Sequence, residues 1–320
     1  MLRLAFIASA LAFSGCGPAK ALLTDVLYDE VALEDALIER DLAYTDGGGD
    51  KHRLDLFLPV ATASRPWPTV VFVHGGGWTE GDRAQTFGGE DIYGNVGRFF
   101  AAHGIGSAVV SYRLMPDATW REQVEDVAAA VAFVQDEVGR RGGDPSSVAV
   151  MGHSAGGYLA AFVALDASVL EDAGAEPVCG AAIVSGAALD LADDATWETG
   201  TEFDYYARRF SPSRTPIDGP PAEPYGWQIE ASPASYATPS APPFSIVYGD
   251  GEEELFQTQA NALTRALEAE NVPVEVAIMP VFNHEAGVFN LSRDDKVAGS
   301  EALRLVDRAC RLPSSRTLEG

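Results

Sequence analysis

The sequence predicts an α/β fold in which helices cover both faces of a mostly parallel central sheet. Short apolar runs recur along the chain, and helix-length segments separate most of them. The 320 residues are 47% hydrophobic and 22% charged, an ordinary globular composition. Strands that alternate with helices in this way are typical of a parallel sheet buried between two helical layers, and one large domain fits the length.

The predicted elements follow one another in a regular order. Residues 42–45 and 52–59 flank the turn sequence DGGGD, which predicts a hairpin at an antiparallel edge of the sheet. The predicted parallel strands cover residues 69–74, 106–112, 147–152, 180–186, 244–249 and 274–279. The clearest helical patterns cover residues 119–138 and 257–272. Residues 191–243 are rich in Pro, Asp and aromatics and too long for a plain connection, so we expect a short irregular lid there.

The N-terminal residues predict export. An apolar run at residues 4–13 follows Arg3 and is too short to span a bilayer, which predicts a signal peptide over residues 1–15. The sequence FSGC resembles a bacterial lipobox, in which Cys16 is lipidated and becomes the first residue of the mature protein. Gly17 then implies an outer-membrane lipoprotein; cleavage and release as a secreted or periplasmic protein is the alternative. Residues 16–41 are acidic and loosely helical, and we expect them to tether a domain over residues 42–315.

Charge and cysteine content limit the partners. The formal net charge of −25 argues against binding to nucleic acid or anionic lipid, so membrane contact is expected only through the lipid anchor. Cys179 and Cys310 remain in a compartment that permits disulfides. Nothing in the sequence places these two residues in contact, so a disulfide and two buried thiols both stay open.

The sequence MGHSAGG, residues 151–157, places Ser154 between two glycines directly after a predicted strand. In a sharp strand–turn–helix the central residue has a strained backbone, and side chains at Gly152 or Gly156 would collide across the bend. Residues 155–165 have the small and apolar character of a helix packed closely on a sheet. This pattern predicts a nucleophile elbow that exposes the Ser154 hydroxyl; an ordinary glycine-rich turn is the alternative.

A second motif, HGGGWTEGD, follows the first parallel strand at residues 74–82. Consecutive glycines let backbone N–H groups converge on one point, as an oxyanion hole requires. Gly76 and Gly77 are the expected donors, together with the N–H of Ala155 at the start of the elbow helix. A phosphate-binding loop is disfavoured because neither a GxGxxG nor a GxxxxGK[ST] pattern is present.

A serine nucleophile needs a neighbouring base, and the chain has five histidines. His284 lies just beyond the last predicted strand, at the sheet edge where active sites of open α/β proteins gather, and we expect it to be the base. The others occupy the hairpin, the glycine motif, the segment before the second parallel strand and the elbow itself: His52, His74, His103 and His153.

The third member should be a carboxylate that orients the histidine. The loop after residues 244–249 offers four candidates, Asp250, Glu252, Glu253 and Glu254. The run follows a strand and lies between serine and histidine in the chain, so we expect at least one of these carboxylates to take the role.

These motifs occur in the order glycine motif, serine, acid, histidine, and the chain resembles an α/β-hydrolase of the esterase branch. HGGGWTEGD, residues 111–134 and residues 143–157 resemble the acetyl and feruloyl esterases and the kynurenine formamidase-like hydrolases. The resemblance covers about residues 42–307. In those families the acid lies three residues after the strand-ending glycine, which from Gly249 implies Glu252. Glu replaces the usual Asp at this position, so Asp250 stays the alternative acid.

The resemblance implies a serine hydrolase that cleaves short-chain carboxylic esters through an acyl-enzyme and requires no metal or cofactor. A small-molecule or polysaccharide-linked ester is the expected substrate. Two other functions stay open: an arylformamidase-like amide hydrolase that uses the same residues, and a non-catalytic binding lipoprotein with the hydrolase fold.

Overall fold

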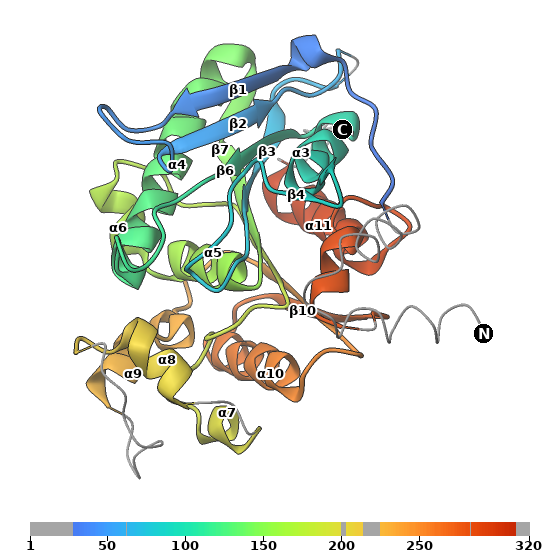
Figure 1. Cartoon of the computed structure of the whole chain (residues 1–320). Coiled ribbons are helices and arrows are strands. Elements are labelled where there is room, and N and C mark those ends of the chain that lie inside the picture. Colours follow the sequence, from blue (N-terminus) through green and yellow to red (C-terminus); the bar gives the residue numbers. More distant parts are fainter. Residues whose placement is uncertain (1–27, 62, 200–202, 214–224, 282, 312–320) are drawn as a thin grey trace, which may run out of the picture.

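The computed structural model describes residues 28–61, 63–199, 203–213, 225–281 and 283–311, and its centre is an eight-stranded sheet (Figure 1). The strand order is β1-β2-β6-β3-β7-β8-β9-β10. β1 pairs with β2, and β2 with β6, in antiparallel register, whereas all later neighbours are parallel. The strands are β1 (Ile38–Ala43), β2 (Arg53–Phe57), β3 (Trp67–Val73), β6 (Gly106–Val110), β7 (Gly143–His153), β8 (Ala181–Val184), β9 (Phe244–Gly249) and β10 (Val274–Met279). The predicted mostly parallel sheet, with a hairpin at its antiparallel edge, is confirmed.

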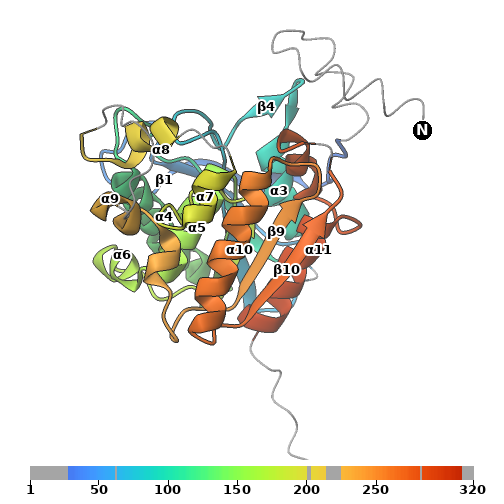
Figure 2. The same ribbon diagram turned by 90° about the horizontal axis from the view of Figure 1, so that it is seen from below.

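Helices cover both faces of this sheet, as the alternation of strands and helices predicts. Figure 2 shows α4, α5 and α10 on one side and α3 and α11 on the other. The longer helices are α3 (Ile92–Ala102), α4 (Trp120–Arg141), α5 (Ala155–Leu165), α10 (Glu254–Ala269) and α11 (Val297–Leu305). The shorter elements of the domain are η1 (Asp35–Leu37), α6 (Ala167–Asp172), η3 (Glu285–Asn290), η4 (Val306–Cys310) and a small hairpin, β4 (Thr86–Phe87) with β5 (Glu90–Asp91).

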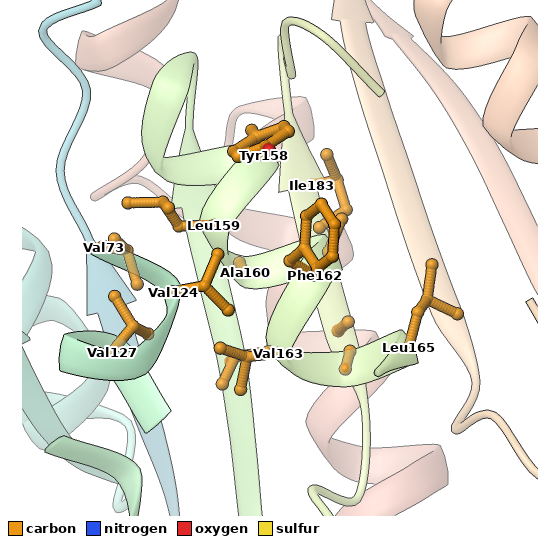
Figure 3. Close-up of a cluster of buried hydrophobic side chains, with 14 of the residues drawn as sticks. Val73, Val124, Val127, Tyr158, Leu159, Ala160, Phe162, Val163, Leu165 and Ile183 are labelled. Atoms are coloured by element: carbon orange, nitrogen blue, oxygen red, sulfur yellow. The ribbon is translucent and has the colours of Figure 1, made fainter. Parts of the chain in front are cut away.

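The helix α5 fixes the position of the serine elbow because it is buried along its whole length. Figure 3 shows its Leu159, Phe162 and Val163 packed among Val73 of β3, Ile183 of β8 and residues of α4. A buried Leu, Val or Phe side chain stabilises a fold by about 1.5–3 kcal/mol relative to its exposed state. The elbow therefore stands on one of the most firmly packed helices of the domain.

The last residues of the segment predicted to be a tether, residues 16–41, differ from that prediction. Residues 1–27, with the predicted signal peptide and Cys16, lie outside the described residues. The sheet already begins at Ile38, within the segment expected to be a loosely helical tether. Arg40 of β1 pairs with the buried Asp55 of β2 at 3.0 Å, and the N–H of Val31 donates to the side chain of Asn95 at 2.7 Å. These contacts place the end of the predicted tether inside the domain.

The described parts of residues 191–243 are mainly helical, where the composition predicted an irregular lid. They contain α7 (Asp194–Glu198), α8 (Phe203–Phe210), α9 (Gly226–Glu230) and η2 (Pro233–Tyr236). Buried aromatics of α8 explain the difference, because Tyr206 and Phe210 pack edge-on against Trp78 with ring centroids 6.2 and 5.0 Å away. An apolar partner outside the segment thus stabilises a helix of only eight residues.

Cys179 and Cys310 form a disulfide that joins the start of β8 to η4, with Cα atoms 5.2 Å apart. The sequence had left this pairing open. Disulfides persist in oxidising compartments, where the predicted export would place the chain. Among the described helices, none combines the length and apolar character needed to cross a membrane.

Candidate active site

Ser154 occupies a sharp turn between the end of β7 and the start of α5. Its backbone has φ +57° and ψ −124°, a strained conformation for a residue with a side chain. A Cβ on Gly152 would lie 2.1 Å from the carbonyl oxygen of Gly156, and a Cβ on Gly156 would lie 2.1 Å from that of Val73. Both positions therefore require glycine, as the sequence pattern predicted, and α5 can approach the sheet closely only because side chains are absent there.

The loop of residues 75–78, here called the oxyanion loop after the role that the sequence predicts for it, follows β3 and passes beside Ser154. A Cβ on Gly75 would lie 3.1 Å from Cβ of Ser154. Gly76 and Gly77 have φ values of +120° and +56°, which favour glycine. Within the described residues, the N–H groups of Gly76, Gly77 and Ala155 have no hydrogen-bond acceptor. These three groups therefore remain free to bind an oxygen atom of a ligand.

His284 stands after β10 and contacts Glu252, which lies in the loop between β9 and α10. Nδ1 of His284 and Oε1 of Glu252 are 3.2 Å apart; the glutamate side chain is fully buried and the histidine is 16% exposed. The hydroxyl of Ser185 also donates to Oε1 at 2.6 Å, and the N–H of Gly249 donates to Oε2 at 2.9 Å. An ionised carboxylate only accepts hydrogen bonds, so this arrangement favours the tautomer with the proton on Nδ1 and a basic Nε2.

The other carboxylates of this loop lie elsewhere. Asp250 is exposed, and its Oδ1 accepts a hydrogen bond from the N–H of Val281 at 3.0 Å. Glu253 and Glu254 are exposed at the start of α10. Of the four candidates, Glu252 is therefore the one that the structure places against His284.

Ser154 and His284 line one cleft of about 530 Å³. The oxyanion loop and helix α8 supply the aromatic side chains Trp78, Tyr205 and Tyr206, and the start of α10 supplies Phe256. The other described lining residues are Gly77, Trp78, Ala187, Thr199, Tyr205, Tyr206, Glu253, Glu254, Leu255, Phe256 and Glu285. A second hollow meets this cleft at the same serine and histidine, and it includes the apolar side chains of Phe87, Ile92, Val288 and Phe289.

Two residues around this site were not found from the sequence. Ser185, at the end of β8, holds Glu252, and its place after a parallel strand was the one available signal. Arg209 of α8 donates from Nε to the carbonyl oxygen of Gly77 at 3.2 Å, and its guanidinium lies 3.5 Å from the ring centroid of Tyr205. No local pattern predicts this contact, because the two partners are 132 residues apart.

The remaining histidines have other surroundings. His52 contacts Asp126 at 3.2 Å, and Nδ1 of His103 donates to the carbonyl oxygen of Phe99 in α3 at 2.8 Å. His74 is buried and stacks on Tyr112 with ring centroids 4.4 Å apart. Burial lowers the pKa of His74 to about 4, so this ring is neutral at pH 7. In the part of the chain that the structure describes, no group of three or more His, Cys, Asp or Glu side chains is arranged to hold a metal ion.

Comparisons with known proteins match the central part of the chain. The family model described as BD-FAE matches residues 54–267, more than half of the sequence. Esterase LipC of Mycobacterium tuberculosis is 31% identical over 221 residues, which is 68% of this chain and 52% of LipC. The probable isoprenylcysteine alpha-carbonyl methylesterase ICME of Oryza sativa subsp. japonica is 36% identical over 128 residues, 40% of this chain and 29% of that protein. The chain thus spans about half or less of the length of these curated relatives.

Solved structures resemble the whole domain. A truncated carbohydrate esterase from gut microbiota has a TM-score of 0.68 at 18% identity and covers 86% of this chain and 99% of its own. Esterase B from Lactobacillus rhamnosis has a TM-score of 0.66 at 24% identity, with coverage of 95% and 94%. At these identities the likeness concerns the fold.

Proposed function

The chain belongs to the BD-FAE family, and from this membership and the geometry around Ser154 we propose that it hydrolyses short-chain carboxylic esters through an acyl-enzyme. Its sheet and helices form the α/β-hydrolase fold of the esterases with which it was compared. One observation carries the proposal: a strained, half-buried serine shares a cleft with a histidine whose Nδ1 contacts a buried carboxylate.

In the proposed acylation step, Oγ of Ser154 attacks the ester carbonyl carbon while Nε2 of His284 accepts the hydroxyl proton. The C=O π bond breaks and its electron pair becomes the oxyanion of a tetrahedral intermediate. The N–H groups of Gly76, Gly77 and Ala155 stabilise this charge, because they are fixed donors that need no reorganisation during the reaction. Collapse of the intermediate expels the alcohol, which takes the proton from His284.

Deacylation repeats these steps with water as the nucleophile. His284 removes a proton from the water, the same three N–H groups hold the second oxyanion, and the acid leaves as Ser154 regains its proton. Glu252 stays ionised throughout and stabilises the imidazolium that forms twice in each cycle. Its hydrogen bonds from Ser185 and Gly249 support this role, since they prevent the carboxylate from turning away from the histidine.

The walls of the cleft support neutral, partly aromatic substrates of the acetyl or feruloyl type. Aromatic rings of Tyr205, Tyr206 and Phe256 offer flat apolar surface, and two hollows that meet at Ser154 suit the acyl and alcohol parts of an ester. Exposed Glu253, Glu254 and Glu285 are also among the lining residues, and no lysine or arginine is among the described ones. Substrates that carry a carboxylate should therefore bind more weakly than neutral ones, and more so at low salt.

The proposal is tested with p-nitrophenyl esters of increasing chain length, a feruloyl ester and N-formylkynurenine, each measured with the wild type and with Ser154→Ala. We expect hydrolysis of the short p-nitrophenyl esters and a loss of about 10³-fold or more in kcat for the variant, with unchanged thermal stability because alanine tolerates the same backbone. Preferential cleavage of N-formylkynurenine would instead favour the arylformamidase function. Equal activity of variant and wild type would refute a serine hydrolase.

A further inference from the structure

Two flat rings enclose the imidazole of His284. The ring of Phe256, from α10, stacks on it with centroids 4.0 Å apart and planes inclined by 13°. The ring of His153, the last residue of β7, stacks on it at 4.8 Å and 22°. All three rings are nearly parallel, and two rings at these distances from the third cannot share one of its faces without overlapping. Phe256 and His153 therefore lie on opposite faces of His284.

His153 is held there as a neutral ring. It is only 5% exposed, and burial, followed by the proximity of His284, keeps its pKa well below the ordinary value for histidine. Neither ring nitrogen makes a hydrogen bond of good geometry among the described residues, although the backbone of His284 is close enough to offset part of the lowering of the pKa. Glycines bound its edges: a Cβ on Gly75 would lie 3.3 Å from Nδ1, and one on Gly287 would lie 3.7 Å from Nε2. Close packing thus fixes this imidazole beside the proposed base.

We propose that His153 and Phe256 are positioning residues that fix the ring plane of His284. This inference rests on the proposed function, in which Nε2 of His284 exchanges protons with Ser154. The contact with Glu252 at 3.2 Å holds only Nδ1, and rotation about the Cβ–Cγ bond of histidine is a soft torsion. Parallel rings on both faces stop that rotation and so fix the direction of Nε2.

The chemistry of the two rings also suits the charge that His284 acquires. When His284 becomes an imidazolium, the face of Phe256 attracts the cation. His153 adds no like charge on the other face, because it stays neutral. The titratable groups that surround His284 are Glu252 and His153 in direct contact, and the cleft residues Glu253, Glu254 and Glu285. The two enclosing rings therefore favour the protonated form of His284 and place no second positive charge beside it.

The test compares variants that keep a ring with variants that remove it. Phe256→Tyr retains a ring whose hydroxyl can reach solvent, since residue 256 is half-buried, whereas Phe256→Leu removes the ring. His153→Phe and His153→Ala form the corresponding pair on the other face. For each variant, kcat and KM for p-nitrophenyl acetate are measured separately from pH 5 to 9, and the melting temperature identifies variants that fail to fold.

We expect the ring-keeping variants to lose much less kcat than the ring-removing ones; Phe256→Tyr should also shift KM, because Phe256 lines the proposed substrate cleft. The ring-removing variants should lose about 10- to 100-fold, as misplaced catalytic groups do. In His153→Ala the apparent pKa of the acidic limb should also rise, because water that reaches the exposed face of His284 stabilises its protonated form. A purely structural role would lower activity without moving this pKa.

The inference is overturned if Phe256→Leu matches Phe256→Tyr within two-fold, or if folded His153→Ala keeps the wild-type rate and pH profile. Folded His153→Phe that is as slow as His153→Ala would also overturn it, since the nitrogens and not the ring plane would then matter. Ser154→Ala is measured in parallel. If it matches the wild type, the proposed function fails; if it is inactive while the ring-removing variants are not, only this inference fails.

Discussion

Glu252→Gln is the sharpest test of how the proposed base is oriented. The wild-type carboxylate accepts from Gly249 at Oε2 and from Ser185 and His284 at Oε1. A glutamine must keep its oxygen toward Gly249, because an NH₂ group there would face a backbone N–H. Its NH₂ then points to His284, while the serine hydroxyl can rotate to accept. His284 has to accept at Nδ1, and its proton moves to Nε2, where the base is required.

The expected loss follows from this change of tautomer. In serine proteases the corresponding Asp-to-Asn substitution keeps the geometry and lowers kcat by about 10⁴-fold. The side chain of Glu252 is fully buried and its amide replacement has the same shape, so we expect about 10³- to 10⁴-fold here. At about 1.4 kcal/mol per factor of ten, this corresponds to about 4–5.5 kcal/mol of transition-state stabilisation.

The assay compares kcat for p-nitrophenyl acetate in Glu252→Gln and in Asp250→Asn at equal thermal stability. Asp250 is a matched control, because it lies in the same loop and also loses one negative charge. Its Oδ1 accepts only from the N–H of Val281, a contact that asparagine preserves, so we expect less than a three-fold change. The opposite ranking of the two variants would refute the assignment and transfer the role to Asp250.

Three further predictions concern groups outside the proposed triad. Arg209→Ala removes the hydrogen bond to the oxyanion loop and should lower kcat/KM about ten-fold. Arg208→Ala, the control, removes the same charge from an exposed ion pair with Asp204 on α8 and should change kcat/KM less than two-fold; equal effects of the two variants would exclude a role for the loop contact. Replacing both Cys179 and Cys310 by alanine should lower the unfolding free energy by about 3–5 kcal/mol in denaturant titrations, because the bridge closes a loop of 131 residues, and an unchanged midpoint would contradict this. The folded pKa of His74, about 4, lies below its unfolded value, so the unfolded chain binds more protons than the folded one between about pH 6.5 and pH 4. The free energy of unfolding therefore falls by up to about 1.4 kcal/mol per pH unit over this range and is not reduced by His74 above about pH 6.5. Between pH 7.5 and pH 5 the free energy of unfolding should fall less for His74→Gln than for the wild type; an equal fall in both would rule this out.

The elements that the sequence predicted best are those whose causes are local. The parallel strands read as apolar runs because both faces of the sheet are covered, and all residues of β3 and β9 are buried. The requirement for glycine at position 152 is also local, because the colliding atoms belong to Gly156 and Gly157 of the same turn, whereas at position 156 they belong to Val73 and His74 at the end of β3. The choice of one acid among the four carboxylates depended on the family resemblance, and the structure places the residue at that spacing, Glu252, against His284.

The errors and omissions have a common origin in contacts between distant parts of the chain. The acidic segment that ends at Asp41 reads as a solvated tether, yet Arg40 pairs with the buried Asp55, and this contact brings the segment into the sheet. The composition of residues 191–243 reads as irregular, yet α8 is stabilised by aromatic packing against Trp78. Hydrophobic periodicity indicates which face of a helix or strand is buried. It does not identify the distant segment of the chain that packs against that face.

The sequence by itself determined the class of the fold, the serine elbow, the glycine-rich oxyanion loop and the order of the proposed triad, because strand burial and turn sterics act over a few residues. The tertiary structure alone decided the Cys179–Cys310 pairing, the hydrogen bond from Ser185 to Glu252 and the stacking of two rings on His284. Each of these joins groups that are tens of residues or more apart in the chain. Ser185, Glu252 and the three rings meet because parallel strands bring their carboxyl ends to one edge of the sheet, whereas Cys179 precedes β8 and meets Cys310 at the amino end of that strand. In each case the path that brings the groups together depends on the packing of the whole domain.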